Sequence, residues 1–374
     1  MKRAITSICI LLAGFGMAST LKLTAQDPSR ADPEFTVTVV EGPKRGAFAV
    51  GDGAVWFLGQ GQLSKLDPAD NHVISVPLED APGPGPMLMA MKGTVPQFFA
   101  VGGGSIWRMA RKSKHELELQ RLDETNGKLL DEIPLSEKQS GSLSYAYGSI
   151  WIWSDMFLDH PLVRVDLAAK QVTTIDLGKG EWSAPCFSEG AVWILGMESG
   201  VVKRIDIQSN KVAEEFSIGQ KQKNGIFSMP FKGGSYYFAV GEGMLWVADS
   251  KNLSSGKYVL SRFDLKTHER VAKLESDPSD GPPVIWHGYV WLSTAGNVMR
   301  GHYLTKISPQ TNHIVGKIFL PATISGRILV SGSMPPRLLA DQDSLWTFSV
   351  GTAGNPPITI HRIQATSSDA SPQK

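Results

Sequence analysis

Apolar residues in this chain occur in short runs separated by turns that contain Gly, Asn or Asp. The stretch Ser188–Asp206, SEGAVWILGMESGVVKRID, shows the pattern: a glycine turn, an apolar run with a tryptophan, a connection, and a second run that ends in a basic residue, an apolar residue and an aspartate. Runs of β-branched and aromatic residues bounded by turn formers are typical of strands. No stretch of roughly a dozen residues shows a helical period of 3.6. The pattern therefore predicts an almost entirely β protein.

The same phrase recurs along the whole chain. Intervals between its tryptophans run from 42 to 55 residues, which is the period of a four-stranded propeller blade and too long for a single hairpin. In the second unit, for example, we expect strands at 97–101, 105–109, 117–122 and 128–135. The repeat therefore predicts a seven-bladed β-propeller. Its seven tryptophans are Trp56, Trp107, Trp151, Trp193, Trp246, Trp291 and Trp346.

The two ends of the repeat array complement one another. The seventh unit has candidate strands at 337–340, 344–349 and 358–363, but no fourth strand before the tail. Residues 35–40, FTVTVV, form an unassigned strand ahead of the first unit. An open ring would expose strand edges that invite aggregation. We therefore expect residues 35–40 to complete the last blade, giving one propeller domain over residues 35–364.

Two repeated features predict structure rather than chemistry. Burying one tryptophan removes on the order of 150–250 Å² from water, so the seven are expected to form the core between blades. A basic residue stands two positions before the end of each third strand, and five units place an Asp at that end. Residues two apart share one strand face, so we expect ion pairs along or between blades and Asp hydrogen bonds into the turns. The basic residues are Lys65, Arg121, Arg164, Arg204, Arg262, Lys306 and Arg362.

The N-terminal segment predicts export. Residues 1–26 begin with a basic pair, Lys2 and Arg3, continue with an apolar run, and offer a small residue at a plausible cleavage point. The run is shorter than the roughly 20 residues that span a bilayer, which favours a signal peptide; an uncleaved anchor is the alternative. We expect an exported protein, periplasmic or extracellular. The Ser-rich tail, residues 365–374, is expected to be disordered.

Composition narrows the range of partners. The formal net charge is +1, and residues 1–26 carry three basic residues and no acid. Such a near-neutral surface argues against nucleic acid, which is met by clustered positive charge. Cys186 is the cysteine left after removal of a signal peptide, so no internal disulfide can form, and we expect a small buried core residue. No later segment is apolar enough to span a membrane, and we expect a monomer that binds a small molecule or a protein.

The repeated phrases resemble a known group of proteins. GDGAVWFL, EGAVWIL and GEGMLWVA, followed by segments such as KLDP, KRID and SRFD, are similar to the bacterial seven-bladed propellers of the YVTN and virginiamycin B lyase-like type. The resemblance covers residues 35–364 and implies the propeller fold. It implies for the lyase branch a Glu-x-His pair and a divalent metal that open a cyclic depsipeptide by elimination. This chain contains no Glu-x-His, and Trp56-Phe57 continues into Leu58-Gly59 instead of the Thr-Glu of that branch.

Strand direction predicts where a ligand site lies. Successive strands of a blade are antiparallel, so two kinds of short turn share one end of the ring and the longer connections share the other. The long segments are 79–96, 219–235, 249–257, 294–302 and 321–336. Function concentrates in variable loops on a rigid frame, so we expect a ligand at the channel mouth of this end. The candidate ligand-binding residues are Arg111, Asp155, His160, Trp182, Asp249, Arg300 and Arg327.

Two classes of function remain open at this mouth. The first is a binding or scaffold module without chemistry. The second is a lyase or hydrolase in which His302 forms an acid–base pair with Glu181 or Glu198, since such groups must meet within hydrogen-bond reach. The simpler interpretation of each candidate is a solvated loop residue. No residues have metal-ligand spacing, so we expect no cofactor, with a divalent metal expected only if the protein is a lyase.

Overall fold

A computed structural model describes most of the ring-forming part of the chain. The described residues are 34–42, 47–59, 62–78, 99–113, 116–153, 161–197, 199–218, 236–249, 258–276, 281–294, 301–321, 337–341, 343–350 and 358–366. The expected signal peptide and most of the expected disordered tail lie outside these residues. In the described part, strands β1 to β28 and one short 3₁₀ helix, η1 (Glu137–Gln139), account for the regular structure. Within it, no helix is long and apolar enough to cross a membrane.

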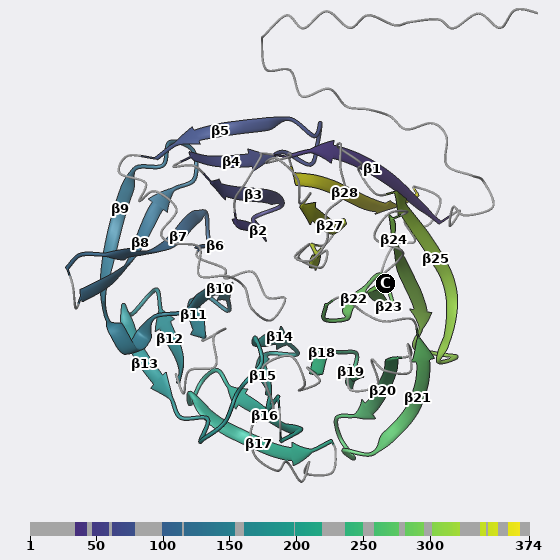
Figure 1. Ribbon diagram of the computed structural model, residues 1–374. Helices are drawn as coiled ribbons and strands as arrows, with labels where there is room; N and C mark the ends of the chain where they lie inside the picture. Colours follow the sequence, from purple (N-terminus) through teal and green to yellow (C-terminus); the bar gives the residue numbers. More distant parts are fainter. Residues whose placement is uncertain are drawn as a thin grey trace, which may run out of the picture.

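The strands form seven four-stranded antiparallel sheets arranged as blades around a ring (Figure 1). The prediction of a seven-bladed, all-β propeller is therefore confirmed. Within each blade the strands are called A to D from the centre outward. Blade 1 consists of β2 (Ala47–Gly51), β3 (Ala54–Gly59), β4 (Gln62–Leu66) and β5 (Val73–Pro77). Blade 2 consists of β6 (Phe99–Val101), β7 (Ser105–Arg111), β8 (Glu116–Asp123) and β9 (Leu129–Ser136). Blade 3 consists of β10 (Ser142–Ala146), β11 (Ser149–Trp153), β12 (Leu162–Asp166) and β13 (Gln171–Ile175).

The remaining blades repeat the same arrangement. Blade 4 consists of β14 (Cys186–Ser188), β15 (Ala191–Leu195), β16 (Val201–Asp206) and β17 (Lys211–Ser217). Blade 5 consists of β18 (Tyr236–Gly241), β19 (Met244–Asp249), β20 (Tyr258–Asp264) and β21 (Arg270–Ser276), and blade 6 of β22 (Val284–Trp286), β23 (Tyr289–Thr294), β24 (Gly301–Ser308) and β25 (His313–Pro321). Blade 7 combines β26 (Arg337–Ala340), β27 (Leu345–Val350) and β28 (Ile358–Ala365) with β1 (Phe35–Glu41).

The ring closes through the N-terminal strand, as the sequence predicts. Strand β1 pairs with β28 from Phe35 opposite Ala365 to Glu41 opposite Thr359. At its start, Phe35 packs edge-on against Trp291 of blade 6 with ring centroids 5.1 Å apart. The backbone amide of Thr366 donates to the carbonyl of Glu34 at 2.8 Å. The first and last described segments therefore lie side by side in the same blade.

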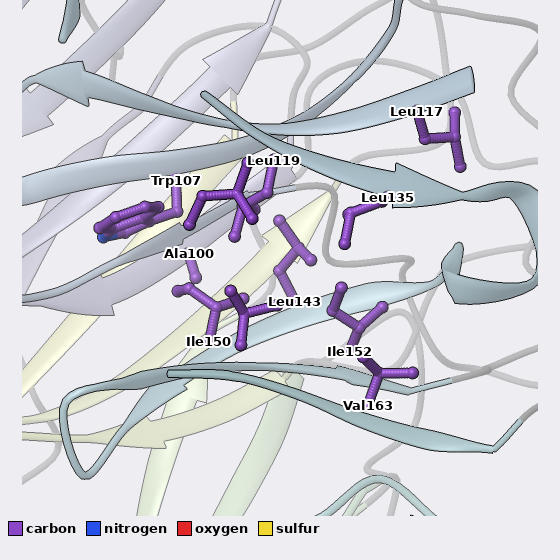
Figure 2. Packing of buried hydrophobic residues seen from close by; sticks show 11 residues of the cluster. Ala100, Trp107, Leu117, Leu119, Leu135, Leu143, Ile150, Ile152 and Val163 are labelled. Carbon is purple, nitrogen blue, oxygen red and sulfur yellow. The ribbon is translucent and has the colours of Figure 1, made fainter. Parts of the chain in front are cut away.

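The hydrophobic core is divided among the interfaces between blades. The seven repeat tryptophans are 0–4 % exposed, which confirms their predicted role. Figure 2 shows the interface between blades 2 and 3, where Trp107 and Leu119 face Ile150 and Val163. Because each B strand is buried on both faces, its apolar residues run continuously instead of alternating.

The turns explain the glycines and aspartates of the repeat. In blades 1 to 6 the A–B turn places two successive residues at positive φ, for example Asp52 (49°) and Gly53 (71°), which is the backbone of a type I′ hairpin turn. In the C–D turns the terminal aspartate accepts hydrogen bonds from the turn itself. The Oδ1 of Asp206, for instance, accepts from the amide of Ser209 at 2.7 Å. The predicted structural role of these aspartates is therefore confirmed.

The turn aspartates predict a loss of stability in acid. Hydrogen bonds from the Thr125 side chain, the Ser209 amide and the Thr267 amide are the main causes that lower the pKa values of Asp123, Asp206 and Asp264 below the usual 3.8. A carboxylate whose folded pKa is depressed stabilises the fold above its unfolded pKa, and this contribution is lost as pH falls through the folded pKa. We expect the urea concentration at the unfolding midpoint of the wild type to decrease as the pH is lowered below about 4. The midpoint of the triple variant D123N/D206N/D264N should decrease less over the same pH range. Equal decreases in the midpoints of the two proteins would contradict this explanation.

Candidate functional site

The two ends of the ring differ in how they are built. The end with the A–B and C–D turns is called the turn end, and the end with the B–C and D–A connections is called the mouth. At the turn end, side chains of one blade satisfy backbone groups of the next. Asp52 Oδ2 accepts from the amide of Gly104 at 2.8 Å, and Glu189 Oε1 accepts from the amide of Gly243 at 2.6 Å. These acidic residues are thereby used in joining neighbouring turns.

The repeated basic residues also join blades. Each is the direct cross-strand partner of the repeat tryptophan in its blade, as in Trp151–Arg164. In six blades its charged group lies 5.0–5.9 Å from that tryptophan ring. In blade 6, Lys306 instead lies over Tyr289 and Phe35, at 4.0 and 4.7 Å. Cation–π contact, which the sequence analysis did not foresee, is therefore a main role of these residues.

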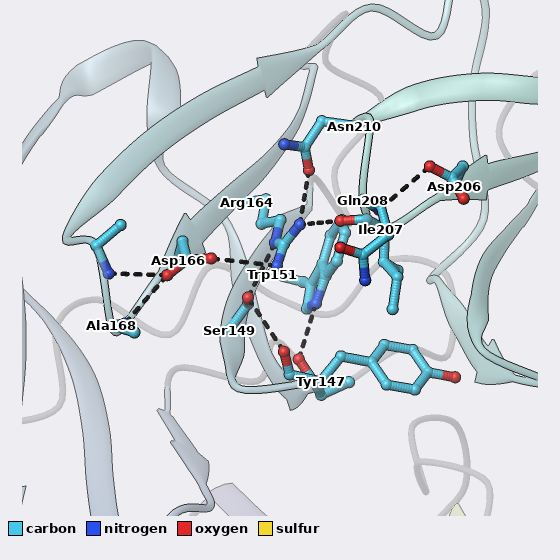
Figure 3. A network of polar contacts seen from close by, with 12 residues as sticks. Tyr147, Ser149, Trp151, Arg164, Asp166, Ala168, Asp206, Ile207, Gln208 and Asn210 are labelled. Atoms are coloured by element: carbon cyan, nitrogen blue, oxygen red, sulfur yellow. Dashed lines mark hydrogen bonds and ion pairs between the residues drawn. The ribbon is translucent and has the colours of Figure 1, made fainter.

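Arg164 shows how the contact extends to the next blade (Figure 3). Its Nε donates to Ser149 Oγ at 2.9 Å and its Nη2 pairs with Asp166 at 3.3 Å. Its Nη1 donates to the carbonyl of Ile207 and, at 2.9 Å, to Asn210 Oδ1 in the C–D turn of blade 4. Asn210 has a φ of 57°, a left-handed conformation that Asn tolerates well. The predicted ion pair is thus present, within a larger network.

The same Arg–Asn contact recurs at alternate interfaces. Arg262 of blade 5 donates to the carbonyl of Pro309 and to Asn312 Oδ1 at 3.1 Å. Arg362 of blade 7 donates to the carbonyl of Pro68 and to Asn71 Oδ1 at 3.5 Å. The latter contact joins the last blade to the first. These guanidinium groups are hydrogen-bonded to the next blade and are therefore poor candidates for ligand binding.

Three of the predicted site residues have described side chains at the mouth. Arg111, the last residue of β7, is exposed and pairs with Glu137 Oε1 at 3.1 Å. Trp182 packs partly against the core between blades 3 and 4, and its Nε1 donates to the carbonyl of Gly178 at 3.3 Å. Lys203 lies 5.0 Å from the centre of the Trp182 ring. The carbonyl of Glu181 accepts from the amide of Met197 at 2.9 Å.

Two further candidates lie in strands instead of the loops that the sequence predicts. Asp249 ends β19 and pairs with Tyr236 and Val259. His302 is the second residue of β24 and pairs with Leu320 of β25. The strand extends because 301–308 and 313–321 form a long, well-paired hairpin across a short turn. The candidates Asp155, His160, Glu198, Arg300 and Arg327 lie outside the described residues.

A polar network on blade 2 was not predicted. Arg108 Nε donates to Gln120 Oε1 at 2.8 Å, and Gln120 Nε2 donates to Glu118 Oε1 at 2.6 Å. All three side chains belong to residues that are 8 % exposed. The exposed Lys112 lies 3.8 Å from Glu118 and links the network to the mouth surface. Its sequence signal is the alternation of Leu with polar residues in ELELQRL, within the stretch where the sequence predicts the third strand of the unit.

The surroundings of Cys186 and the grouping of possible metal ligands bear on what chemistry the described part of the chain could support. Burial raises the pKa of the Cys186 thiol to about 11, so it stays protonated at neutral pH, although part of the residue reaches the surface. It packs against the core between blades 4 and 5 as a partly buried residue, where the sequence predicts a buried one. Among the described residues, no group of three or more His, Cys, Asp and Glu side chains could hold a metal ion.

Comparisons with known proteins support the fold. No family model matches the chain, and no curated protein does. Among solved structures, Kuenenia stuttgartiensis hydrazine synthase superposes with a TM-score of 0.56 at 13 % identity, over 88 % of this chain and 97 % of that chain. The WD40 β-propeller domain of Doa1 superposes with a TM-score of 0.50 at 13 % identity, over 88 % of this chain and 95 % of that domain. At this identity the chain is similar to both in its propeller fold.

Proposed function

We propose that this protein is a binding or scaffold module whose ligand or protein partner docks at the mouth. The observation that carries the proposal is the difference between the two ends of the ring. At the turn end, Arg and Asp side chains are committed to neighbouring turns. At the mouth, blade 2 holds a buried charged network that reaches the surface at Lys112, beside the exposed Arg111. A rigid ring with one such end suits recognition.

The proposal also includes a family relationship and a cellular location. The phrases GDGAVWFL, EGAVWIL and GEGMLWVA support a relationship to the YVTN and virginiamycin B lyase-like propellers. The basic pair and apolar run of residues 1–26 support export to the periplasm or the extracellular space. Folds of this kind host many functions, so binding is proposed here from the mouth itself.

The proposal is tested by locating a bound ligand on the ring. The full chain is screened by thermal shift against divalent metals, cyclic peptides, sugars and candidate proteins, and each hit is mapped by hydrogen exchange. We expect protection of mouth segments, such as residues 109–118, with the turn segments 51–54 and 123–128 unchanged. The variant R111A/K112A should weaken a mouth ligand, whereas K128A at the turn end is the matched control. Protection confined to the turn end would overturn the proposal.

A further inference from the structure

The interface between blades 6 and 7 differs from its six counterparts. Three positions face one another in every interface. The first is the residue two positions after the repeat tryptophan of one blade. The other two lie on the following blade: the residue directly after the repeat tryptophan of that blade, and the residue of strand C that pairs with it. The first is apolar in the other six interfaces. Between blades 6 and 7 all three positions are polar: Ser293, Thr347 and His361.

Strand alternation places this polar trio on opposed faces. Trp291 of β23 packs against Leu345 and Ile363 of blade 7 in one cluster. Ser293 lies two residues beyond Trp291 and therefore shares its face. By the same rule Thr347 shares the face of Leu345, and His361 shares the face of Ile363. The polar trio therefore continues this cluster toward the mouth, where β23 ends at Thr294.

The polar trio is buried. Ser293 and Thr347 are 1 % exposed, and His361 is 3 % exposed. Ser293 Oγ has no hydrogen-bond partner among the described residues. A buried hydroxyl without a partner is unfavourable, and the other interfaces show that an apolar residue fits this position. Packing alone therefore does not explain the serine at this position.

We propose that the polar trio binds a carboxylate between blades 6 and 7. The Ser and Thr hydroxyls and an imidazole N–H can all donate hydrogen bonds, and a carboxylate is an acceptor at both oxygens. No acidic residue occupies any of the three positions. Hydrogen bonds to a charged acceptor are the strong ones. This site and the network on blade 2 consist of different residues, so a negative result at one does not contradict the proposal made for the other.

Acetate is the probe that tests the site. The full chain is titrated with sodium acetate against sodium chloride at equal ionic strength, following the melting temperature and the imidazole proton signals, with His361 assigned through H361Q. We expect a saturable rise in melting temperature and a saturable movement of the His361 signal. S293A should weaken acetate binding by about tenfold, while its melting temperature without acetate rises or stays unchanged.

Two comparisons make the outcome decisive. T347V should also weaken the response, whereas S261A, which alters the position of blade 5 equivalent to His361, should bind acetate like the wild type. If acetate gives no saturable change in the wild type, the site does not exist. If S293A responds to acetate as the wild type does, the polar trio is not where it binds.

Discussion

Deletion of residues 34–41 is expected to abolish the cooperative unfolding transition of the propeller. Without β1, strand β28 loses its outer partner along its length. Phe35 and Val40, which are 9 % and 4 % exposed, leave the clusters on the two sides of blade 7. The single change F35A removes the ring that contacts Trp286 and Trp291. It should cost about 3–5 kcal/mol in the free energy of unfolding, as large-to-small core changes do.

A neighbouring residue provides the control for this strand. Thr36 is exposed, and its hydroxyl lies 3.5 Å from the carbonyl of Gln364, so T36A should change the free energy of unfolding by less than about 0.5 kcal/mol. Urea denaturation followed by tryptophan fluorescence measures all three proteins. A deletion variant that unfolds with the midpoint and slope of the wild type would show that β1 does not close the ring.

R362A is expected to have the second largest effect. The guanidinium lies over the Trp346 ring at 5.1 Å, donates from Nε to Ser344 Oγ at 2.9 Å, and donates from Nη1 to the carbonyl of Pro68 in blade 1. Arg362 is 8 % exposed, so its loss leaves buried acceptors unsatisfied. We expect a cost of roughly 2–4 kcal/mol from the lost charged hydrogen bonds and the ring contact.

Arg204 is the matched control for Arg362. It occupies the same repeat position in blade 4, but Ala191 stands where blade 7 has Ser344, and its ring contact with Trp193 is 5.9 Å. R204A should therefore cost about 1 kcal/mol or less. R362K should restore only part of the stability, because Lys keeps the charge but not the planar set of donors. Equal losses in the free energy of unfolding for R362A and R204A, measured by urea denaturation, would show that the contact of Arg362 with blade 1 does not stabilise the ring.

The fold could be predicted because its signals are repeated and local. Each blade carries its own tryptophan, six carry a glycine in the A–B turn and five a terminal aspartate, so an ambiguity in one unit is resolved by the others. The missing fourth strand of the last unit and the extra strand at 35–40 identified the closure. Long-range contacts were less predictable: the spacing of Arg164 and Asp166 indicates a shared strand face, but not that Arg164 reaches Asn210 in the next blade.

The candidate site could be predicted only as a region. Antiparallel strand order fixes which end bears the long connections, but the position of a side chain depends on how far each strand extends, so Asp249 and His302 fall inside strands. Polar residues within apolar strands, such as Arg108 and Ser293, could be recognised only by aligning the units position by position and knowing which faces meet. That information comes from the packing between blades.

The contact between Glu34 and Thr366 fixes the end of the ring at which the chain enters and leaves the propeller. Strand β1 begins and β28 ends at the turn end, and the two segments are hydrogen-bonded there. Any membrane, fusion partner or solid support that holds the chain by a segment preceding residue 34 or following residue 366 is therefore attached on that side. A propeller immobilised in this way would direct its opposite opening toward the surrounding medium.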